Sequence, residues 1–181
     1  MGLYPEFETE SDSSMDLKRL HQASNSADEI VPGLWLGNRH AAADTSFGNI
    51  RAVFNCSKDI PFNPSVPRHY RIPVDDSRQE PDIQNMEKWS FEIVYKIAHE
   101  MRKSSAEGGE VLVHCAAGMQ RSAAAVAMYL IAMQGLTTDE AILFIRKKRP
   151  IAFQPEPNFE KSIRGFEATF KRDIAPKLTT K

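Results

Sequence analysis

The chain has 181 residues, of which 41% are hydrophobic and 26% are charged, and its formal net charge is -1. This length suits one domain with flexible ends, and the lack of a long uncharged apolar run excludes a membrane-spanning helix. Because 23 basic residues are balanced by 24 acidic ones, the chain lacks the charge excess that draws nucleic acid or anionic lipid, and we expect neither nucleic acid nor a membrane as a partner.

The two cysteines, Cys56 and Cys115, are too few for a disulfide framework and form no Cys-x-x-Cys pair. The first residues contain no basic segment followed by an apolar core, which would mark a secretory signal. We therefore predict a protein of the cytoplasm or nucleus whose thiols stay reduced.

The first 28 residues are polar and rich in Ser, Glu and Asp, which predicts a solvated segment outside the core. Residues 16–20 have the composition of a short helix capped by a preceding serine. We favour a frayed helix here, and the alternative is an arm that binds a partner or a second copy of the chain.

Alternating strands and helices are predicted from residue 30 onward. Residues 30–37 indicate two short strands around a Pro-Gly turn, and a helix over 38–43 follows. Brief β-prone runs predict strands over 52–56 and 69–74, and apolar residues at helical spacing predict a helix over 83–101.

The second half begins with an apolar strand over 111–113. Three helices are predicted after it: 122–134 closed by Gly135, one opened by Thr138 and ended by Arg149-Pro150, and one over 158–170. Residues 172–181 are predicted to be a loose tail. Strands that alternate with helices imply an α/β domain with a largely parallel sheet, in which ligands bind beyond the carboxyl ends of the strands.

The loop after the strand at 111–113 carries the chemistry. Cys115 and Arg121 bracket five residues that include Gly118, so the loop can turn its N–H groups inward toward the positive end of the next helix. Such surroundings lower a cysteine pKa from about 8.5 to roughly 3.5–7.5 and produce a nucleophilic thiolate. The Arg121 guanidinium can pair with two oxygens of a tetrahedral dianion, and the loop amides with the third. The sequence therefore predicts a phosphate site with a nucleophile at its floor.

Residues 114–122 match the His-Cys-x5-Arg-Ser/Thr signature of the cysteine-dependent protein tyrosine phosphatases. Further segments resemble, in order, the landmarks of dual-specificity phosphatase catalytic domains: Trp35-Leu36-Gly37-Asn38, Phe54-Asn55-Cys56-Ser57, Ile72-Pro73-Val74-Asp75-Asp76, and Arg149-Pro150 with Pro157-Asn158-Phe159. The loop is similar to those of poxviral H1-type enzymes, small cellular dual-specificity phosphatases and MAP kinase phosphatases. The resemblance implies a protein tyrosine phosphatase-like α/β fold, with a central mostly parallel sheet flanked by helices, and a catalytic domain over 29–171.

The resemblance also implies a two-step reaction through a phosphocysteine intermediate. Cys115 would be the nucleophile, Arg121 would bind the phosphate, and Ser122 would help the thiolate to leave. His114 would be a buried support. The residues implied to bind substrate together with Arg121 are Ala116, Ala117, Gly118, Met119 and Gln120.

The general acid is expected in the Asp75-Asp76 pair. Aligned on the preceding Ile-Pro, Asp76 is the better match, but the loop looks one residue longer than usual, so Asp75 stays an alternative. The other interpretation of either residue is a solvated carboxylate in a turn. For Cys56, a buried unreactive cysteine is favoured over a protective disulfide with Cys115.

The uncharged residues within the loop favour phosphotyrosine and phosphoserine or phosphothreonine in proteins as substrates. Relatives that act on phosphoinositides tend to carry loop lysines, and RNA 5′-triphosphatases resemble His-Cys-Thr-His-Gly. The loop resembles neither of them at Ala116, Ala117, Met119 and Gln120. A non-protein phosphate remains the alternative, followed by a pseudophosphatase that only binds phosphoproteins.

No metal or other cofactor is expected, because neighbouring residues of a strand point to opposite faces and His114 and Cys115 lack further ligands at suitable spacing. The N-terminal arm resembles in placement a helix that some viral relatives exchange between subunits. A homodimer through this arm is therefore a further hypothesis.

Overall fold

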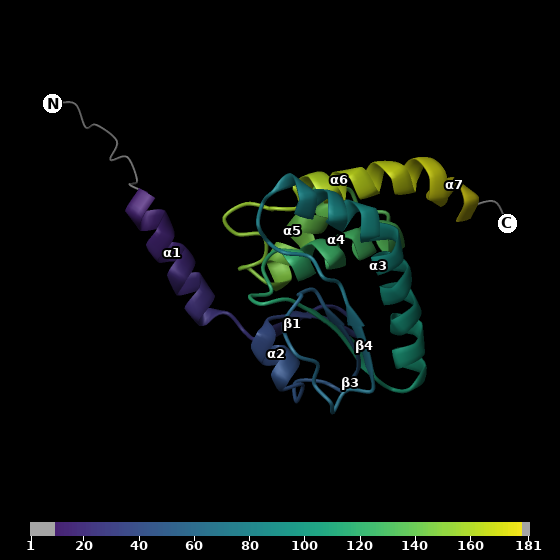
Figure 1. Ribbon diagram of the computed structural model, residues 1–181, viewed down its shortest axis with the longest axis horizontal. Coiled ribbons are helices and arrows are strands. Elements are labelled where there is room, and N and C mark those ends of the chain that lie inside the picture. The colour runs from purple at the N-terminus through teal and green to yellow at the C-terminus, as the bar shows by residue number, and fades with distance from the viewer. Residues whose placement is uncertain (1–9, 179–181) are drawn as a thin grey trace.

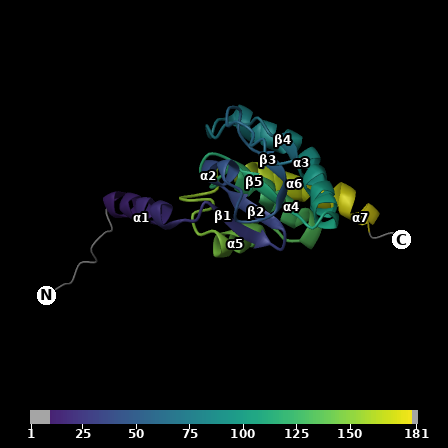
Figure 2. The ribbon, with the colours of Figure 1, turned by 90° about the horizontal axis from the view of Figure 1, so that it is seen from below.

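The computed structural model describes residues 10–178, with side chains from residue 16, so the first nine residues of the predicted polar segment and residues 179–181 lie outside it. Its centre is a five-stranded sheet in the order β1-β2-β5-β3-β4. Helices lie around this sheet in Figure 1, and Figure 2 labels the strands. The strands are β1 (Ala27–Val31), β2 (Leu34–Gly37), β3 (Ile50–Asn55), β4 (Arg68–Arg71) and β5 (Glu110–His114). Only the β1–β2 pair is antiparallel, so the predicted mostly parallel sheet is confirmed.

Seven α-helices and one π-helical turn occur in the described part of the chain. They are α1 (Glu10–Ala23), α2 (Arg39–Ala43), α3 (Glu80–Ala106), α4 (Arg121–Gln134), α5 (Thr138–Lys148), α6 (Glu160–Thr169), the turn η1 (Phe170–Ile174) and α7 (Ala175–Leu178). No helix among these is long and apolar enough to cross a membrane.

The two faces of the sheet bury different partners because side chains alternate along each strand. In β5, Val111 and Val113 join the large core formed with helices α3 to α6, whereas Leu112 belongs to a smaller cluster on the other face. Ala41 of α2 packs into that smaller cluster. The sheet is thus covered on both sides, as the alternating pattern of strands and helices predicts.

Three parallel strands end at the same level. The register pairs Gly37 of β2 and Asn55 of β3 with His114 of β5. Because the carboxyl ends of these strands meet at one edge, the residues that come after them are brought together, and Cys56 donates its N–H to the His114 carbonyl at 2.7 Å.

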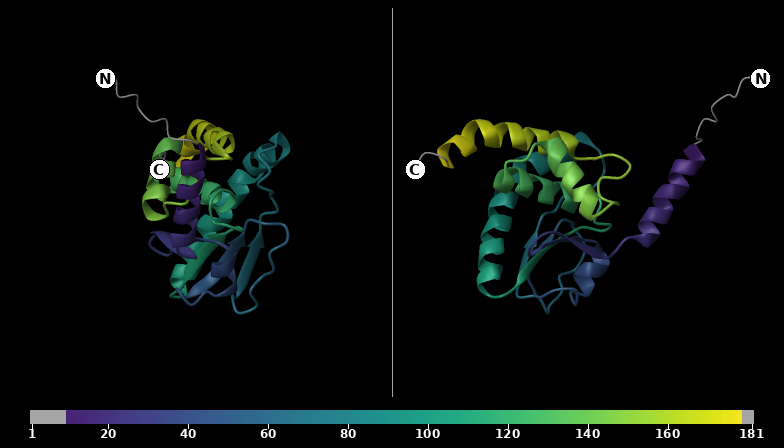
Figure 3. Two further views of the ribbon diagram at one scale, coloured as in Figure 1. Left: turned by 90° about the vertical axis from the view of Figure 1, so that its left-hand side faces the viewer. Right: turned by 180° about the vertical axis from the view of Figure 1, so that it is seen from behind.

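The N-terminal helix is longer than the sequence predicts. It spans Glu10–Ala23 rather than 16–20. It stands apart from the helices that cover the sheet in Figure 1, in Figure 2 and in the right-hand view of Figure 3. The segment after it forms the edge strand β1, so the chain joins the sheet a few residues before the predicted start at residue 30.

The prediction of a loose tail from residue 172 is wrong as far as Leu178. The last helix continues through η1 into α7. Phe170 is buried, and Ile174 and Ala175 pack against the main core. These apolar contacts keep the segment helical. The sequence did not predict them because charged residues separate the apolar ones.

Candidate functional site

The predicted phosphate loop lies between β5 and α4. Cys115 is 3% exposed, and its Sγ lies 3.1 Å from Ser122 Oγ. Gly118 has φ +67°, and an added Cβ would come within 2.6 Å of the Gly37 carbonyl oxygen. A side chain at this position is therefore excluded both by the backbone conformation and by lack of space.

The helix after the loop is buried nearly all round. Residues 122–131 of α4 are buried, and many of them are alanines, so the helix can approach the sheet closely. Its first turn consequently points N–H groups at Cys115 from within the core. This placement concentrates the helix dipole on the loop.

The surroundings of Cys115 favour its thiolate. Burial by itself raises the pKa of this thiol, but the Ser122 hydroxyl and N–H, the Arg121 charge and the Gly118 N–H together lower the pKa below its ordinary value of 9.0. The loop therefore supplies an anionic sulfur inside the protein.

Arg121 connects the loop to the segment that comes after β4. Its Nη1 donates to the Val74 carbonyl at 3.2 Å. Its Nε is buried and has no hydrogen-bond partner among the described residues. A buried donor of this kind is expected to meet an acceptor, and an oxygen of a bound tetrahedral anion would be one.

A cavity of about 240 Å³ brings the predicted site residues together. Its lining is Asp76, Arg78, Cys115, Ala116, Ala117, Met119, Gln120, Arg121, Gln154 and Asn158. Gly118 and Ser122 are buried beneath this surface. Gly118 is thus the one predicted substrate-binding residue that does not line the cavity.

The two candidate acids have different surroundings. Asp76 lines the cavity, and its Oδ1 accepts a hydrogen bond from Asn158 Nδ2 at 2.7 Å. Asp75 is absent from the lining and forms an ion pair with Lys58 at 2.7 Å, in which the two side chains are 52% and 53% exposed. The geometry thus favours Asp76 over Asp75.

Three lining residues were missed as site residues from the sequence. Asn158 and Gln154 come from the segment between α5 and α6, and Arg78 comes from the connection between β4 and α3. Arg78 has φ +60°, which is unusual for a residue other than glycine. The Pro-rich sequence around Asn158 indicated an irregular segment but not its position beside the cavity.

Gln120 has a structural role in addition to lining the cavity. Its Nε2 donates to the carbonyls of Gln154 and Glu156, and its Oε1 accepts the Asn158 N–H at 2.9 Å. The side chain therefore holds the Asn158 segment against the phosphate loop.

His114 and Cys56 lie beside the loop and are both buried. Burial lowers the pKa of His114 to about 4, so the imidazole is neutral near pH 7, consistent with a support role. Burial, followed by the charge of Cys115, raises the pKa of Cys56 well above its ordinary value. The two cysteines are free thiols.

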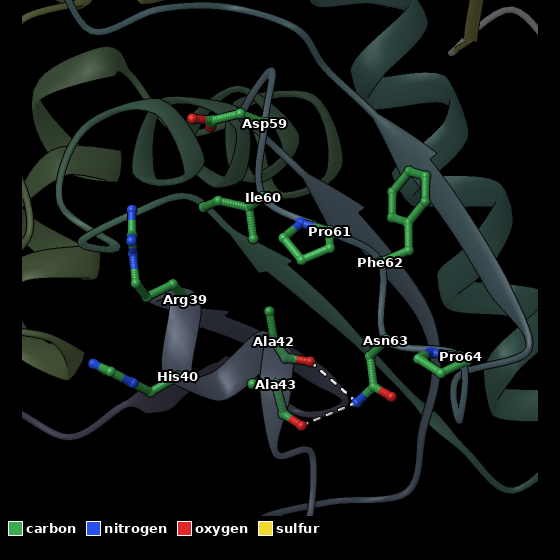
Figure 4. Close-up of a pocket in the computed structure, with 10 residues that line it drawn as sticks. All are labelled: Arg39, His40, Ala42, Ala43, Asp59, Ile60, Pro61, Phe62, Asn63 and Pro64. Carbon is green, nitrogen blue, oxygen red and sulfur yellow. Dashed lines mark hydrogen bonds between the residues drawn. The ribbon is translucent and has the colours of Figure 1, made fainter.

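A larger hollow lies beside the loop but holds no reactive thiol. It measures about 490 Å³ and is lined by α2 and residues 59–64, with Asn63 donating to the carbonyls of Ala42 and Ala43 (Figure 4). It borders the site because the Arg39 N–H at the start of α2 donates to the Ala116 carbonyl at 3.1 Å. Chemistry rather than size therefore identifies the smaller cavity as the candidate active site.

The chain is similar in sequence to known phosphatases. MAP kinase phosphatase with leucine-rich repeats protein 3 of Dictyostelium discoideum is 33% identical over 144 residues, which cover 77% of this chain and 16% of that protein. Human Dual specificity protein phosphatase 16 is 31% identical over 147 residues, covering 78% of this chain and 21% of that protein. The chain thus spans less than a quarter of the length of either relative.

The fold is also found in solved structures. The crystal structure of human DUSP28 superposes with a TM-score of 0.67 at 24% identity, covering 81% of this chain and 96% of that one. Residues 34–169 match the family described as dual specificity phosphatase, catalytic domain, and this range contains the cavity and every residue that lines it. The chain belongs to the dual specificity phosphatase catalytic domain family.

Proposed function

We propose that the protein is a cysteine-dependent phosphatase that hydrolyses phosphotyrosine and phosphoserine or phosphothreonine in protein substrates through a phosphocysteine intermediate. The observation that carries this proposal is the cavity shared by Cys115, Arg121 and Asp76, together with the lowered pKa of the Cys115 thiol. A nucleophile, an anion-binding group and an acid at one cavity are the parts that phosphoryl transfer through an enzyme thiol needs.

In the first step the Cys115 thiolate attacks phosphorus while Arg121 and the loop N–H groups bind the non-bridging oxygens. The sulfur–phosphorus bond forms as the bond to the leaving oxygen breaks, and Asp76 donates a proton to that oxygen. The fit of a dianion is supported by the unpartnered Arg121 Nε and by the start of α4 directly below the loop.

In the second step water attacks the phosphocysteine and gives its proton to the Asp76 carboxylate. The phosphorus–sulfur bond breaks, and the electron pair returns to sulfur. Ser122 assists because its hydroxyl, 3.1 Å from Cys115 Sγ, can donate a hydrogen bond to the departing thiolate.

Asp76 is proposed as the acid for a structural reason. The Asn158 amide holds one carboxylate oxygen at 2.7 Å, and Asn158 is itself held by Gln120 of the phosphate loop. The acid is therefore tied to the loop that carries the nucleophile, whereas Asp75 is tied to the exposed Lys58.

Phosphoproteins are proposed as substrates because the loop residues that line the cavity between Cys115 and Arg121 are uncharged: Ala116, Ala117, Met119 and Gln120. The extent of the catalytic domain over 29–171, the location in the cytoplasm or nucleus and a homodimer through the N-terminal arm remain predictions. Equal masses of the full chain and of a variant lacking residues 1–23 in solution scattering, both at the monomer value, would remove the dimer hypothesis.

Turnover of phosphotyrosine and phosphothreonine peptides, a phosphoinositide and a 5′-triphosphorylated RNA by the purified protein tests the proposal. We expect hydrolysis of both peptides that persists in EDTA, is blocked by vanadate and is lost in Cys115→Ser. Faster hydrolysis of the lipid or the RNA than of the peptides would indicate that the substrate is a non-protein phosphate. Peptide binding without turnover would indicate a pseudophosphatase.

A further inference from the structure

Arg149, the residue after α5, has a completely buried side chain. Its Nη1 forms an ion pair with Asp28 at 2.8 Å and donates to the Asn25 carbonyl at 2.8 Å. Its Nε donates to the Gly118 carbonyl at 2.9 Å, and its Nη2 donates to the Ala117 carbonyl at 3.3 Å. One guanidinium thus connects the start of the sheet with the phosphate loop.

A buried guanidinium requires such partners, because an unpaired charge in the protein interior is strongly unfavourable. Asp28 is the carboxylate that neutralises Arg149, and the Asp28 side chain is only 15% exposed. Asn25 holds the other carboxylate oxygen through its Nδ2 at 2.9 Å. Residues 25–28 therefore fix the charge and position of the group that contacts the loop.

The contacts of Arg149 also set the direction of the loop amides. In a trans peptide the carbonyl and the next N–H point in opposite directions. Since the carbonyls of Ala117 and Gly118 turn toward Arg149, the N–H groups of Gly118 and Met119 turn away from it, to the side of Cys115. The Gly118 N–H is indeed one of the groups that stabilise the Cys115 thiolate.

The loop and the guanidinium are in tight contact. A Cβ added at Gly118 would lie 2.8 Å from Arg149 Nη2. The next carbonyl, that of Met119, is held separately by the Phe153 N–H at 2.7 Å. The Arg149 side chain and the Phe153 N–H both belong to the segment that begins at Arg149. This segment therefore binds three successive carbonyls of the loop, those of Ala117, Gly118 and Met119.

We propose that the Asp28–Arg149 ion pair is a positioning device for the phosphate loop, which makes residues 25–28 part of the functional unit. These residues precede the region 34–169 that matches the family. Neither side chain lines the cavity, so the pair acts through the loop backbone and not on the substrate. The kinetic consequence rests on the proposed phosphatase function, whereas the consequence for anion binding does not.

The chain provides a control pair outside the lining of the cavity. Arg68 of β4 pairs with the fully buried Glu100 of α3 at 3.0 Å, and neither residue lines the cavity. Asp28→Asn and Glu100→Gln both remove a charge from a buried pair while keeping the shape of the side chain. Comparison of these two variants separates a general loss of stability from an effect on the loop.

The first experiment measures vanadate affinity and the rate of Cys115 alkylation by iodoacetamide at pH 6.5, with folding checked by circular dichroism and thermal melting. We expect Asp28→Asn to weaken vanadate binding and to slow alkylation by about tenfold each, since misdirected loop amides stabilise an anion poorly. Glu100→Gln should lower the melting temperature and leave both values within about twofold of wild type.

Equal effects of the two substitutions on vanadate affinity, or no effect of either, would overturn the proposal. Arg149→Lys covers the case in which Asp28→Asn does not fold, because lysine keeps the charge beside Asp28 but cannot reach both loop carbonyls with one planar fork. It should bind vanadate less tightly than Arg68→Lys does.

Deletion of residues 1–24 against deletion of residues 1–28 provides a second comparison, and only the longer deletion should weaken vanadate binding. If the shorter deletion already weakens vanadate binding as much as the longer one, the effect belongs to α1 and the proposal is contradicted. If wild type binds vanadate but hydrolyses no phosphoester, the proposed function fails while this inference can still be tested.

Discussion

Strands β3 and β5 run parallel and pair without a shift from Ala52 to Asn55. Each leads at its carboxyl end into a buried cysteine, Cys56 after Asn55 and Cys115 after His114. The two thiols nevertheless have pKa values shifted in opposite directions. The pKa of Cys115 is lowered, and that of Cys56 is raised. Burial and position in the sheet are the same for both residues, so neither of them accounts for the difference.

The residues on the C-terminal side of each cysteine make the main difference, and the charge of Cys115 further raises the pKa of Cys56. After Cys115 the chain turns at once into α4, and the Ser122 hydroxyl and the Gly118 N–H reach the sulfur. After Cys56 the Ser57 hydroxyl donates instead to the Asn55 side chain at 2.5 Å, and no helix begins there. A strand end becomes a nucleophilic site only where the next residues supply donors and a helix start.

The largest effect is expected from exchanging the cysteines one at a time. Cys115→Ser should reduce turnover by at least about 10³-fold, because a serine hydroxyl in this site is a far weaker nucleophile than a thiolate. Cys56→Ala should retain turnover within a few fold and lower stability by about 1 kcal/mol through the small cavity left behind. Phosphatase assays and urea unfolding measure the two effects, and loss of turnover in Cys56→Ala would contradict the comparison.

The next effect concerns the connection after β4, which places Asp76, the proposed acid, at the cavity. Asp76→Asn should slow hydrolysis of an alkyl phosphopeptide by about 10²–10³-fold and that of a phosphate ester with a good leaving group much less. Asp75→Asn should change either rate by less than about twofold, since exposed ion pairs such as Asp75–Lys58 contribute little. The assignment fails if Asp75→Asn shows the stronger dependence on the leaving group.

The residues before the cysteines differ as well, and His114 predicts a pH effect on stability that Asn55 cannot produce. Burial lowers the pKa of His114 from 6.5 to about 4. Between pH 6.5 and pH 4, His114 is protonated in the unfolded chain but neutral in the folded protein. The stability contributed by the neutral side chain is therefore fully present above pH 6.5 and is lost as the pH falls toward 4. The free energy of unfolding should decrease by roughly 3 kcal/mol over this range.

Urea unfolding between pH 7.5 and pH 4.5 measures this slope. His114→Asn should flatten it, whereas the same change at the exposed His99 should leave the wild-type slope. A wild-type slope in His114→Asn would show that other groups cause the acid sensitivity.

The smallest effect concerns Asn158, which positions Asp76. Asn158→Ala removes one hydrogen bond to a carboxylate and should slow hydrolysis of alkyl phosphopeptides by about tenfold. Alkylation of Cys115 should be unchanged, because Asn158 does not contact the sulfur. Asn63→Ala, which also removes an amide from a loop near the site, is the control and should leave the rate unchanged. Slower alkylation in Asn158→Ala would indicate that the whole loop had moved.

That Cys115, Arg121 and Ser122 lie together could be predicted from the sequence, because all three lie within residues 114–122. A strand, a tight turn at Gly118 and a helix start are determined by local backbone preferences, and they bring these groups together without help from distant residues. The alternation of strands and helices determined the mostly parallel sheet in the same local way.

The contacts that favour Asp76 over Asp75 as the proposed acid are visible only in the tertiary structure. Adjacent carboxylates have the same local sequence, and they differ in partners 82 and 17 residues away, Asn158 and Lys58. The Asp28–Arg149 pair, separated by 121 positions, and the helical packing of residues 170–178 could not be predicted for the same reason. The free energy of a buried charge or an apolar contact depends on which surfaces the fold brings together, and neighbouring residues carry no information about that.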